Sequence, residues 1–243
     1  MRSLRAAVSF LTVLPVANRD GSAGARLGRA YFPAIGALVG LAAGLVFVLG
    51  AAIFAPLVAA AVAVAALTLL TGALHLDGLA DAADGLLARG DKARRLEVMR
   101  DPRLGSYGVA ALVVALVLQV ATIASMPPGH ALVGLVIAGA LSRMAALGVI
   151  ALVPYVRAQG LGTAPSSSER RGVDLAVGAA TALMVSALDW RRAAVAAVAV
   201  AACVVTLVVV ARRRVGGATG DVLGATVEIS QLAVLLVFAA QSL

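Results

Sequence analysis

Apolar residues fill most of this chain in long runs, which short polar segments separate. Seven runs have the length of about 20 residues that a helix needs to cross roughly 30 Å of hydrocarbon. They cover residues 31–55, 56–74, 107–126, 131–153, 172–188, 193–211 and 222–240. The pattern predicts an all-α, polytopic membrane bundle of about seven transmembrane helices, in which residues 1–243 form a single domain.

The first 17 residues precede these runs and have two readings. Arg2 and Arg5 stand before a short apolar stretch, and the small residues Gly21-Ser22-Ala23 are a candidate signal-peptide cleavage site. If the N-terminus instead stays in the cytoplasm, the alternating spans leave segments 1–30, 75–106, 154–171 and 212–221 inside. These segments hold all but three of the 20 Lys and Arg residues. The positive-inside rule therefore favours an uncleaved chain with its N-terminus inside, and a short interfacial or re-entrant helix at residues 1–17.

Composition refines the picture of the bundle. Hydrophobic residues make up 62% of the chain, charged ones 13% and aromatic ones only 4%. Slim helices rich in small residues are expected to pack closely, through faces such as Gly36 to Gly44 and Gly134 to Gly148. Packing within one chain is the better expectation, but packing between two chains stays open, so an oligomer is possible. The lone Cys203 excludes an intrachain disulfide.

One segment, His75 to Gly85, sets three carboxylates into this apolar background. An aspartate in hydrocarbon costs several kcal/mol and usually marks a functional site. Asp77, Asp81 and Asp84 are spaced four and seven residues apart, so they share a helical stripe about 60° wide. Clustered carboxylates suit hard divalent ions, and Mg²⁺ typically binds a few carboxylates, waters and substrate phosphate oxygens. The stripe predicts a metal-dependent phosphoryl-transfer site.

A second acidic patch opens the last predicted span. Asp221 and Glu228 are seven residues apart and share a helical face, and Gly216-Gly217, Gly220 and Gly224 would let another backbone or a phosphate come close. In the inferred topology both acidic patches face the cytoplasm. The five carboxylates are therefore expected to meet in one pocket.

Basic residues near these patches have two possible roles. The net charge of +8 is explained by membrane orientation together with an anionic substrate, and no nucleic-acid partner is expected. Arg100 and Arg103 enter a span through a turn bounded by glycine, and Arg143 lies inside a span, where a guanidinium needs an anionic partner. We expect these three arginines to contact substrate. His75 lies roughly opposite the aspartate stripe on an ideal helix, so a metal-ligand role would need a bend at Gly78, and a helix-capping or orienting role is an equal alternative.

Two other functional interpretations of the acidic residues are considered beside an enzyme. Intramembrane acids beside helices interrupted by glycine also occur in ion-coupled transporters and divalent-metal channels. The acids here gather at one predicted end of the bundle, and no matching set lines the other half. In a purely structural reading, the acids would only cap helices and pair with loop arginines.

The residues resemble the cobalamin synthase family, the adenosylcobinamide-GDP ribazoletransferases. The resemblance runs through most of the chain and is most specific in three segments. They are Thr71-Gly72-Ala73-Leu74-His75-Leu76-Asp77-Gly78-Leu79-Ala80-Asp81-Ala82-Ala83-Asp84-Gly85-Leu86, Met99-Arg100-Asp101-Pro102-Arg103-Leu104-Gly105-Ser106-Tyr107-Gly108, and Gly216-Gly217-Ala218-Thr219-Gly220-Asp221 with Glu228 following. Ser230-Gln231 departs from the pattern, because another acidic residue is expected nearby.

The resemblance implies a Mg²⁺-dependent enzyme of the bacterial cytoplasmic (inner) membrane, whose active site faces the cytoplasm. It would transfer adenosylcobinamide phosphate from adenosylcobinamide-GDP to α-ribazole or its 5′-phosphate and release GMP. Asp77, Asp81 and Asp84 would hold the metal, and Asp221 and Glu228 would complete its shell or hold a second ion. Asp221 or Asp101 would be the general base. The substrate-binding residues would be Arg100, Arg103, Arg143, His75, Ser106 and Thr219.

Overall fold

The structure is a computed structural model that describes residues 2–16, 28–156 and 168–241. These residues are mostly helical, and their connecting segments contain an isolated parallel bridge between Tyr155 and Ala218. The helices in chain order are α1 (Arg2–Leu11), η1 (Arg29–Tyr31), α2 (Phe32–Ala51), α3 (Pro56–Thr71), α4 (Leu74–Leu87), α5 (Lys92–Val98), α6 (Ser106–Ser125), α7 (Pro128–Leu152), α8 (Ser168–Ser186), η2 (Ala187–Asp189), α9 (Trp190–Val215) and α10 (Gly220–Ala239). The prediction of an all-α membrane bundle is confirmed.

Proline and glycine set several of the helix ends. Pro56 and Pro128 begin α3 and α7, where the missing N–H of proline costs no hydrogen bond. Gly72 and Gly216 end α3 and α9 in the left-handed conformation that favours glycine. These four helix ends therefore lie close to where the apolar runs are interrupted.

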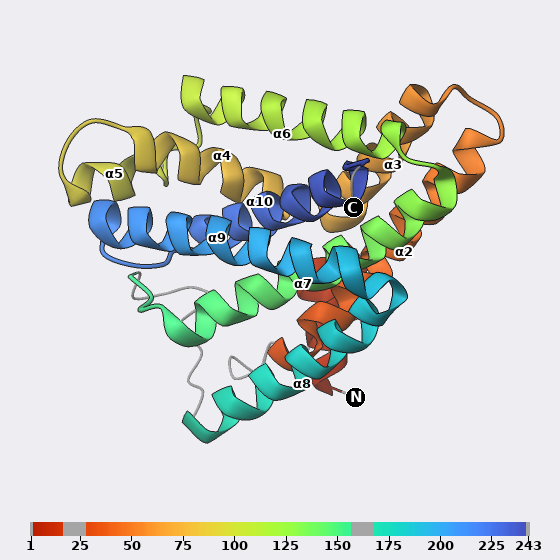
Figure 1. Ribbon diagram of the computed structural model, residues 1–243. Coiled ribbons are helices and arrows are strands. Elements are labelled where there is room, and N and C mark those ends of the chain that lie inside the picture. Colours follow the sequence, from red (N-terminus) through yellow and green to blue (C-terminus); the bar gives the residue numbers. More distant parts are fainter. Residues whose placement is uncertain (1, 17–27, 157–167, 242–243) are drawn as a thin grey trace.

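The long helices run between two ends of the molecule (Figure 1). At one end lie α5, the start of α6 and the junction of α9 with α10. At the other end lie the loops that join α2 to α3 and α6 to α7, and the turn between α8 and α9. Helix α10 packs against α4, α6, α7 and α9, which places it in the centre of the bundle.

Helices α2 and α7 form the most extensive helix pair. They meet at glycines, because a Cβ atom on Gly36 would overlap the carbonyl oxygen of Gly139, and a Cβ atom on Gly139 would overlap that of Gly36. Gly40 likewise lies against the backbone of Leu135. The expectation that small-residue faces pack within the chain is met by this pair.

The predicted number of seven spans is not confirmed. By length and hydropathy, five helical segments of the described chain could cross a membrane, or six if α3 and α4 together form one span. Helix α3 has only 16 residues and is followed by a bend of 89° into α4. Residues 171–215, predicted as two spans, are one continuous helical stretch of 45 residues in that count, but the stretch turns at η2 and so consists of two helices, α8 and α9. The bend between α3 and α4 was missed, because hydropathy measures length and not direction.

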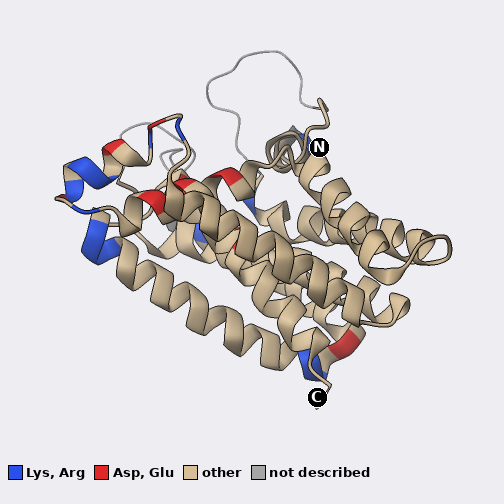
Figure 2. Cartoon of the chain, turned by 90° about the horizontal axis from the view of Figure 1, so that it is seen from above, with Lys and Arg blue, Asp and Glu red and all other residues tan. Residues whose placement is uncertain are grey.

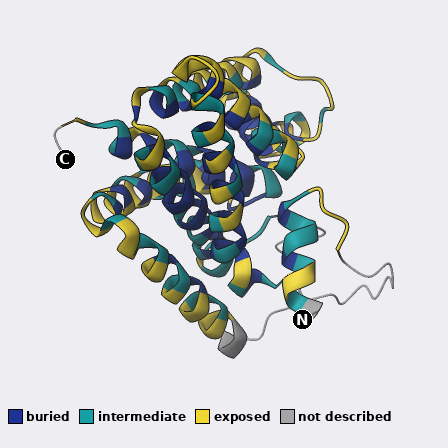
Figure 3. Cartoon of the chain, turned by 90° about the vertical axis from the view of Figure 1, so that its right-hand side faces the viewer, coloured by how far each residue is buried: buried dark blue, intermediate teal, exposed yellow. Residues whose placement is uncertain are grey.

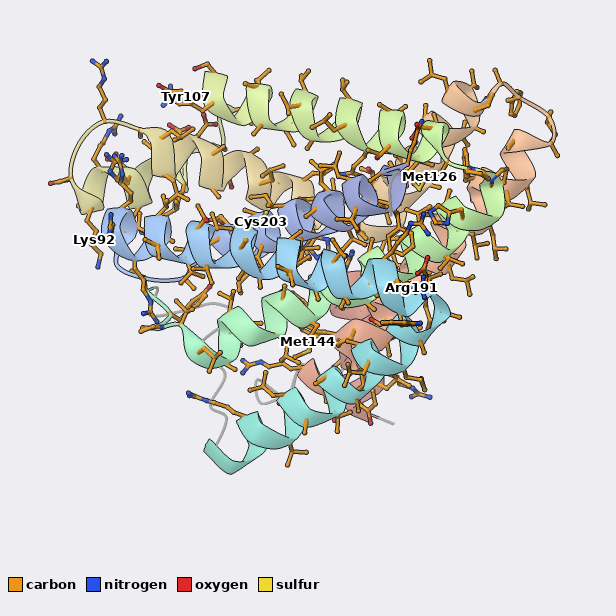
Figure 4. The ribbon with its side chains drawn as sticks, viewed as in Figure 1. Lys92, Tyr107, Met126, Met144, Arg191 and Cys203 are labelled. Atoms are coloured by element: carbon orange, nitrogen blue, oxygen red, sulfur yellow. The ribbon has the colours of Figure 1, made fainter. Side chains whose placement is uncertain are left out.

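Charged residues gather mainly at the end that carries α5 and the close of α9, with a smaller group near the C-terminus (Figure 2). Lys92 and Arg191 lie at these opposite ends, and Cys203 lies between them on α9 (Figure 4). Between the ends the outward surface exposes large apolar side chains, while buried residues fill the interior (Figure 3). This distribution is typical of a protein embedded in lipid.

The short N-terminal helix is present as α1 and lies against α2. Ala7 and Leu11 on its inner face are buried with Phe32 and Ile35 of α2. The candidate cleavage site at residues 21–23 lies outside the described residues.

Candidate active site

The aspartate stripe lies on α4, which begins at a sharp break in the chain. Gly72 and Ala73 both have positive φ angles, of 60° and 56°, and they turn α4 away from α3. For a non-glycine residue such as Ala73 this conformation is uncommon and often accompanies a functional constraint. On α4, Asp77 is exposed, Asp81 is half-buried and Asp84 is buried.

Asp77 and Asp81 face a pocket of about 530 Å³. One wall comes from α4, a second from the turn between α5 and α6, and a third from Leu112 and Leu116 of α6. The remaining lining residues are Ala73, Leu76, Ala80, Met99, Arg100, Asp101, Pro102, Arg103 and Leu104. The pocket is thus lined by two carboxylates, Asp77 and Asp81, and by two arginines, Arg100 and Arg103, from the turn between α5 and α6.

The turn between α5 and α6, residues 99–105, is called the arginine turn here and is shaped by an internal ion pair. Asp101 accepts hydrogen bonds from the backbone N–H of Arg103 at 3.0 Å and from its guanidinium at 2.9 and 2.7 Å. These hydrogen bonds lower the pKa of Asp101 to about 2, and they raise the pKa of Arg103. The side chain of Arg103 remains 87% exposed, and Arg100 is exposed as well. Both cationic groups are available to an anionic ligand at the pocket.

Asp84 turns toward α6 instead of the pocket. Its Oδ2 accepts the N–H of Gly105 at 2.8 Å, and its Oδ1 accepts the N–H of Gly108 at 2.9 Å. These donors stand in the first turn of α6, for which Gly105 is the N-cap residue. Neither Asp84 nor the exposed Ser106, the first residue of α6, lines the pocket.

Asp221 comes close to the aspartate helix through a crossing of two glycines. A Cβ atom on Gly78 would lie 2.9 Å from the Cα of Gly224 and 3.1 Å from the carbonyl oxygen of Asp221. The first turn of α10 therefore borders the residue next to Asp77. Thr219 is the N-cap residue of α10, and its hydroxyl accepts the N–H of Val222 and donates to Asp221 Oδ2 at 3.2 Å.

Glu228 belongs to a separate polar network in the bundle core. Its carboxylate accepts a hydrogen bond from Gln119 of α6 at 2.9 Å, and Gln231, one turn farther along α10, accepts one from Arg143 of α7 at 2.8 Å. All four side chains are at least 93% buried. The guanidinium of Arg143 also donates to the hydroxyl of Ser142 at 3.0 Å, so the hydrogen-bond partners of this buried cation are neutral side chains.

Arg143 and His75 line a small cavity of about 60 Å³ beneath Phe10 and Leu11 of α1. His75 is 4% exposed and lies on the face of α4 away from the pocket, as its spacing predicted. Its Nδ1 and the Nε of Arg143 have no hydrogen-bond partner within the described chain. The structure does not bring either side chain to the pocket.

The predicted gathering of five carboxylates is therefore only partly seen. Among the described residues, no three acidic, histidine or cysteine side chains lie together as a ready metal site. Asp77 and Asp81 share the pocket, Asp221 approaches α4 beside it, and Asp84 and Glu228 have other partners. Their roles as metal ligands stay predictions.

Some residues of the site region carry no sequence signal that points to a site. Gln119 and Gln231 are neutral amides in apolar runs, and the only hint is that a polar side chain there needs a partner. Met99 looks like an ordinary apolar residue. It is 2% exposed and packs against Gly85, with its sulfur 4.0 Å from the hydroxyl of Thr219.

Comparison with known proteins identifies similar chains over nearly the whole sequence. A chain from Bradyrhizobium diazoefficiens is 37% identical over 241 residues, which span 98% of this chain and 93% of the relative. A chain from Pseudomonas savastanoi is 40% identical over 241 residues, 96% of this chain and 97% of the relative. Both relatives are named adenosylcobinamide-GDP ribazoletransferase. No solved structure matches the chain. The profile of the cobalamin-5-phosphate synthase family matches residues 3–239, and the chain belongs to this family.

Proposed function

We propose that this protein transfers adenosylcobinamide phosphate from adenosylcobinamide-GDP to α-ribazole or its 5′-phosphate and releases GMP. The names of its relatives support the transferase reading and a role in assembling the nucleotide loop of vitamin B12. The apolar helices support a place in the bacterial inner membrane. We further propose that the charged end, with its pocket, faces the cytoplasm, because basic residues concentrate there.

The observation that carries the proposal is the pocket between α4 and the arginine turn. Arg100 and Arg103 can neutralise the negative diphosphate of the substrate from one side. The apolar wall from Leu112 and Leu116 leaves room for a less polar part of the ligand. A diphosphate ester attached to a large organic group combines these two properties.

The pocket also fits a Mg²⁺ ion. Mg²⁺ in enzymes is usually held by one or two carboxylates together with waters and substrate phosphates, so a cage made wholly of protein is not required. Asp77 and Asp81, one turn apart on the pocket face of α4, provide such a pair. When bound, Mg²⁺ would offset charge on the diphosphate and polarise its phosphoryl oxygens.

The transfer requires one bond to form and one to break. A ribose hydroxyl oxygen of α-ribazole attacks the phosphorus on the cobinamide side of the diphosphate, the P–O bond to GMP breaks, and GMP leaves with the bridging oxygen. The hydroxyl proton passes to a base. Asp101 is poorly suited to accept it, because its pKa of about 2 makes it a very weak base. Asp221, which borders Gly78, is the better candidate.

The proposal is tested by GMP release from the purified protein in lipid nanodiscs. Adenosylcobinamide-GDP and α-ribazole are supplied together or singly, with and without Mg²⁺. We expect GMP to appear only when both substrates and the metal are present, together with a cobalamin product on chromatography. A folded preparation that releases no GMP would refute the transferase proposal, and uptake of divalent metal by sealed vesicles would then test the transporter reading.

A further inference from the structure

We propose that Asp84 is a positioning residue that holds the arginine turn against the aspartate helix, and that it is not a metal ligand. The turn comprises residues 99–105. The inference rests on the proposed transferase function, because the turn matters as the phosphate-binding wall of the pocket. It differs from what the spacing of Asp77, Asp81 and Asp84 suggests, since that spacing makes the three residues equivalent.

The contacts of Asp84 are those of a helix cap supplied from another helix. A capping side chain normally accepts the N–H of the third helical residue, and a second side chain accepts the N–H of the N-cap residue itself. Here Gly108 is the third residue of α6 and Gly105 its N-cap, and the two oxygens of Asp84 accept both N–H groups. One buried carboxylate thus performs both halves of a capping box.

The close approach of Asp84 to α6 requires glycine at both positions. A Cβ atom on Gly105 would overlap the carboxylate of Asp84, and all three of its nearest atoms would belong to that group. A Cβ atom on Gly108 would overlap the same carboxylate. The glycines that bound Ser106-Tyr107 therefore serve the close approach of α6 to Asp84.

The arginine turn is fixed at both of its ends. Met99 is buried against Gly85, the neighbour of Asp84, and Gly105 is held by Asp84 itself. Between these points Arg100 and Arg103 extend to the pocket, where Asp77 and Asp81 lie opposite. If Asp84 is lost, the near end of α6 is released from α4, and the arginines lose their fixed distance from the aspartates.

A rescue experiment separates a cap from a ligand. In Asp84→Ala the space beside Gly105 becomes free, and Gly105 has the extended φ and ψ, −90° and 174°, that are typical of an N-cap residue. A serine placed there can accept the N–H of Gly108 from within α6. The set consists of the wild type, Asp84→Ala, Gly105→Ser and the double variant Asp84→Ala with Gly105→Ser.

We expect Asp84→Ala to raise the KM for adenosylcobinamide-GDP roughly tenfold, because the loss of one helix N-cap costs a free energy that corresponds to about this factor. The substitution should also lower the melting temperature. Its kcat should fall much less. The double variant should recover most of both losses, and Gly105→Ser alone should be impaired because it displaces the buried carboxylate. Affinity for Mn²⁺, a paramagnetic probe of a Mg²⁺ site, should change less than about twofold across the set.

Two results would overturn the inference. One is a large loss of Mn²⁺ affinity in Asp84→Ala, and the other is a double variant that recovers neither KM nor melting temperature. If Asp84→Ala does not fold, Asp84→Asn, which keeps one acceptor oxygen, should fold with a melting temperature below that of the wild type and with unchanged Mn²⁺ affinity. If the wild type releases no GMP, the proposed function fails, while melting temperature and Mn²⁺ binding still decide the role of Asp84.

Discussion

At the scale of single residues, the aspartates of α4 are chemically alike and differ in what surrounds them. Asp77 and Asp81 face the pocket, whereas Asp84 is buried against backbone N–H groups. Asp101 and Asp221 differ in their surroundings as well, because Asp101 accepts hydrogen bonds from Arg103, whereas Asp221 accepts one from the hydroxyl of Thr219. The role of each aspartate therefore depends on the hydrogen-bond donors around its carboxylate.

Asp81→Asn tests the pocket role directly. We expect GMP release to fall by roughly two orders of magnitude or more, because the amide removes charge at the metal and phosphate site while keeping the shape of the side chain. Membrane insertion and melting temperature should stay close to wild type. Glu97→Gln is the matched control, since Glu97 is an exposed acid of α5 outside the pocket and pairs with Arg94 on the surface. Near-normal turnover of Asp81→Asn would remove Asp81 from the site.

Asp101→Asn tests which group sets the dependence of activity on pH. The pKa of Asp101 is depressed from 3.8 to about 2, so its pairing with Arg103 is complete above the ordinary value and is lost only as the pH falls toward 2. We therefore expect the profile of GMP release above about pH 5 to have the same acid limb in the variant and the wild type. Disappearance of that limb in the variant would identify Asp101 as the base.

At the scale of helices, glycine decides which helices approach and how closely. Gly36 and Gly139 bring α2 and α7 into backbone contact, and Gly78 and Gly224 do the same for α4 and α10. Without the second crossing, the first turn of α10 could not reach the aspartate helix. Hydrophobic attraction between helices is weak in lipid, so close packing of this kind carries much of the stability.

A pair of substitutions on α7 tests this contribution. Gly139→Ala should lower the melting temperature, because its Cβ would overlap the backbone of Gly36 and overpacking of this kind costs about 1–3 kcal/mol. Gly148→Ala on the same helix should be neutral or slightly stabilising, since nothing lies within 4 Å of its Cβ position. Thermal unfolding in detergent compares the two. Equal melting temperatures would show that the crossing adds little.

At the scale of the whole molecule, the apolar pattern predicted the helices well and the site only in part. The apolar runs predicted the positions of most helices, and the small-residue faces predicted close packing of the kind seen between α2 and α7. The bend at Gly72 and Ala73 was missed, since hydropathy carries no direction. Glu228 shares a helical face with Asp221 but lies about 10 Å farther along the axis of α10, in reach of Gln119 and not of the pocket. Spacing along one helix predicts a shared face, whereas depth and partners depend on the neighbouring helices.

The proposed orientation of the molecule can be measured with single cysteines in a Cys203→Ala background. Ala187→Cys lies in η2 and Arg213→Cys near the end of α9, at opposite ends of the bundle, and both positions are exposed. In spheroplasts, an impermeant maleimide should label Ala187→Cys and should reach Arg213→Cys only after the membrane is permeabilised. The reverse pattern would place the pocket outside the cell.

The carboxylate of Asp84 against two glycines also has an evolutionary consequence. Because Gly105 can gain a side chain only where Asp84 has been lost, the two positions cannot drift independently as sequences diverge. Relatives that lack the acid should carry serine, threonine or aspartate in place of Gly105, and relatives that keep the acid should keep both glycines. A single lineage would have to change both residues almost together, so we expect this pair to leave one of the clearest covariation signals in the family.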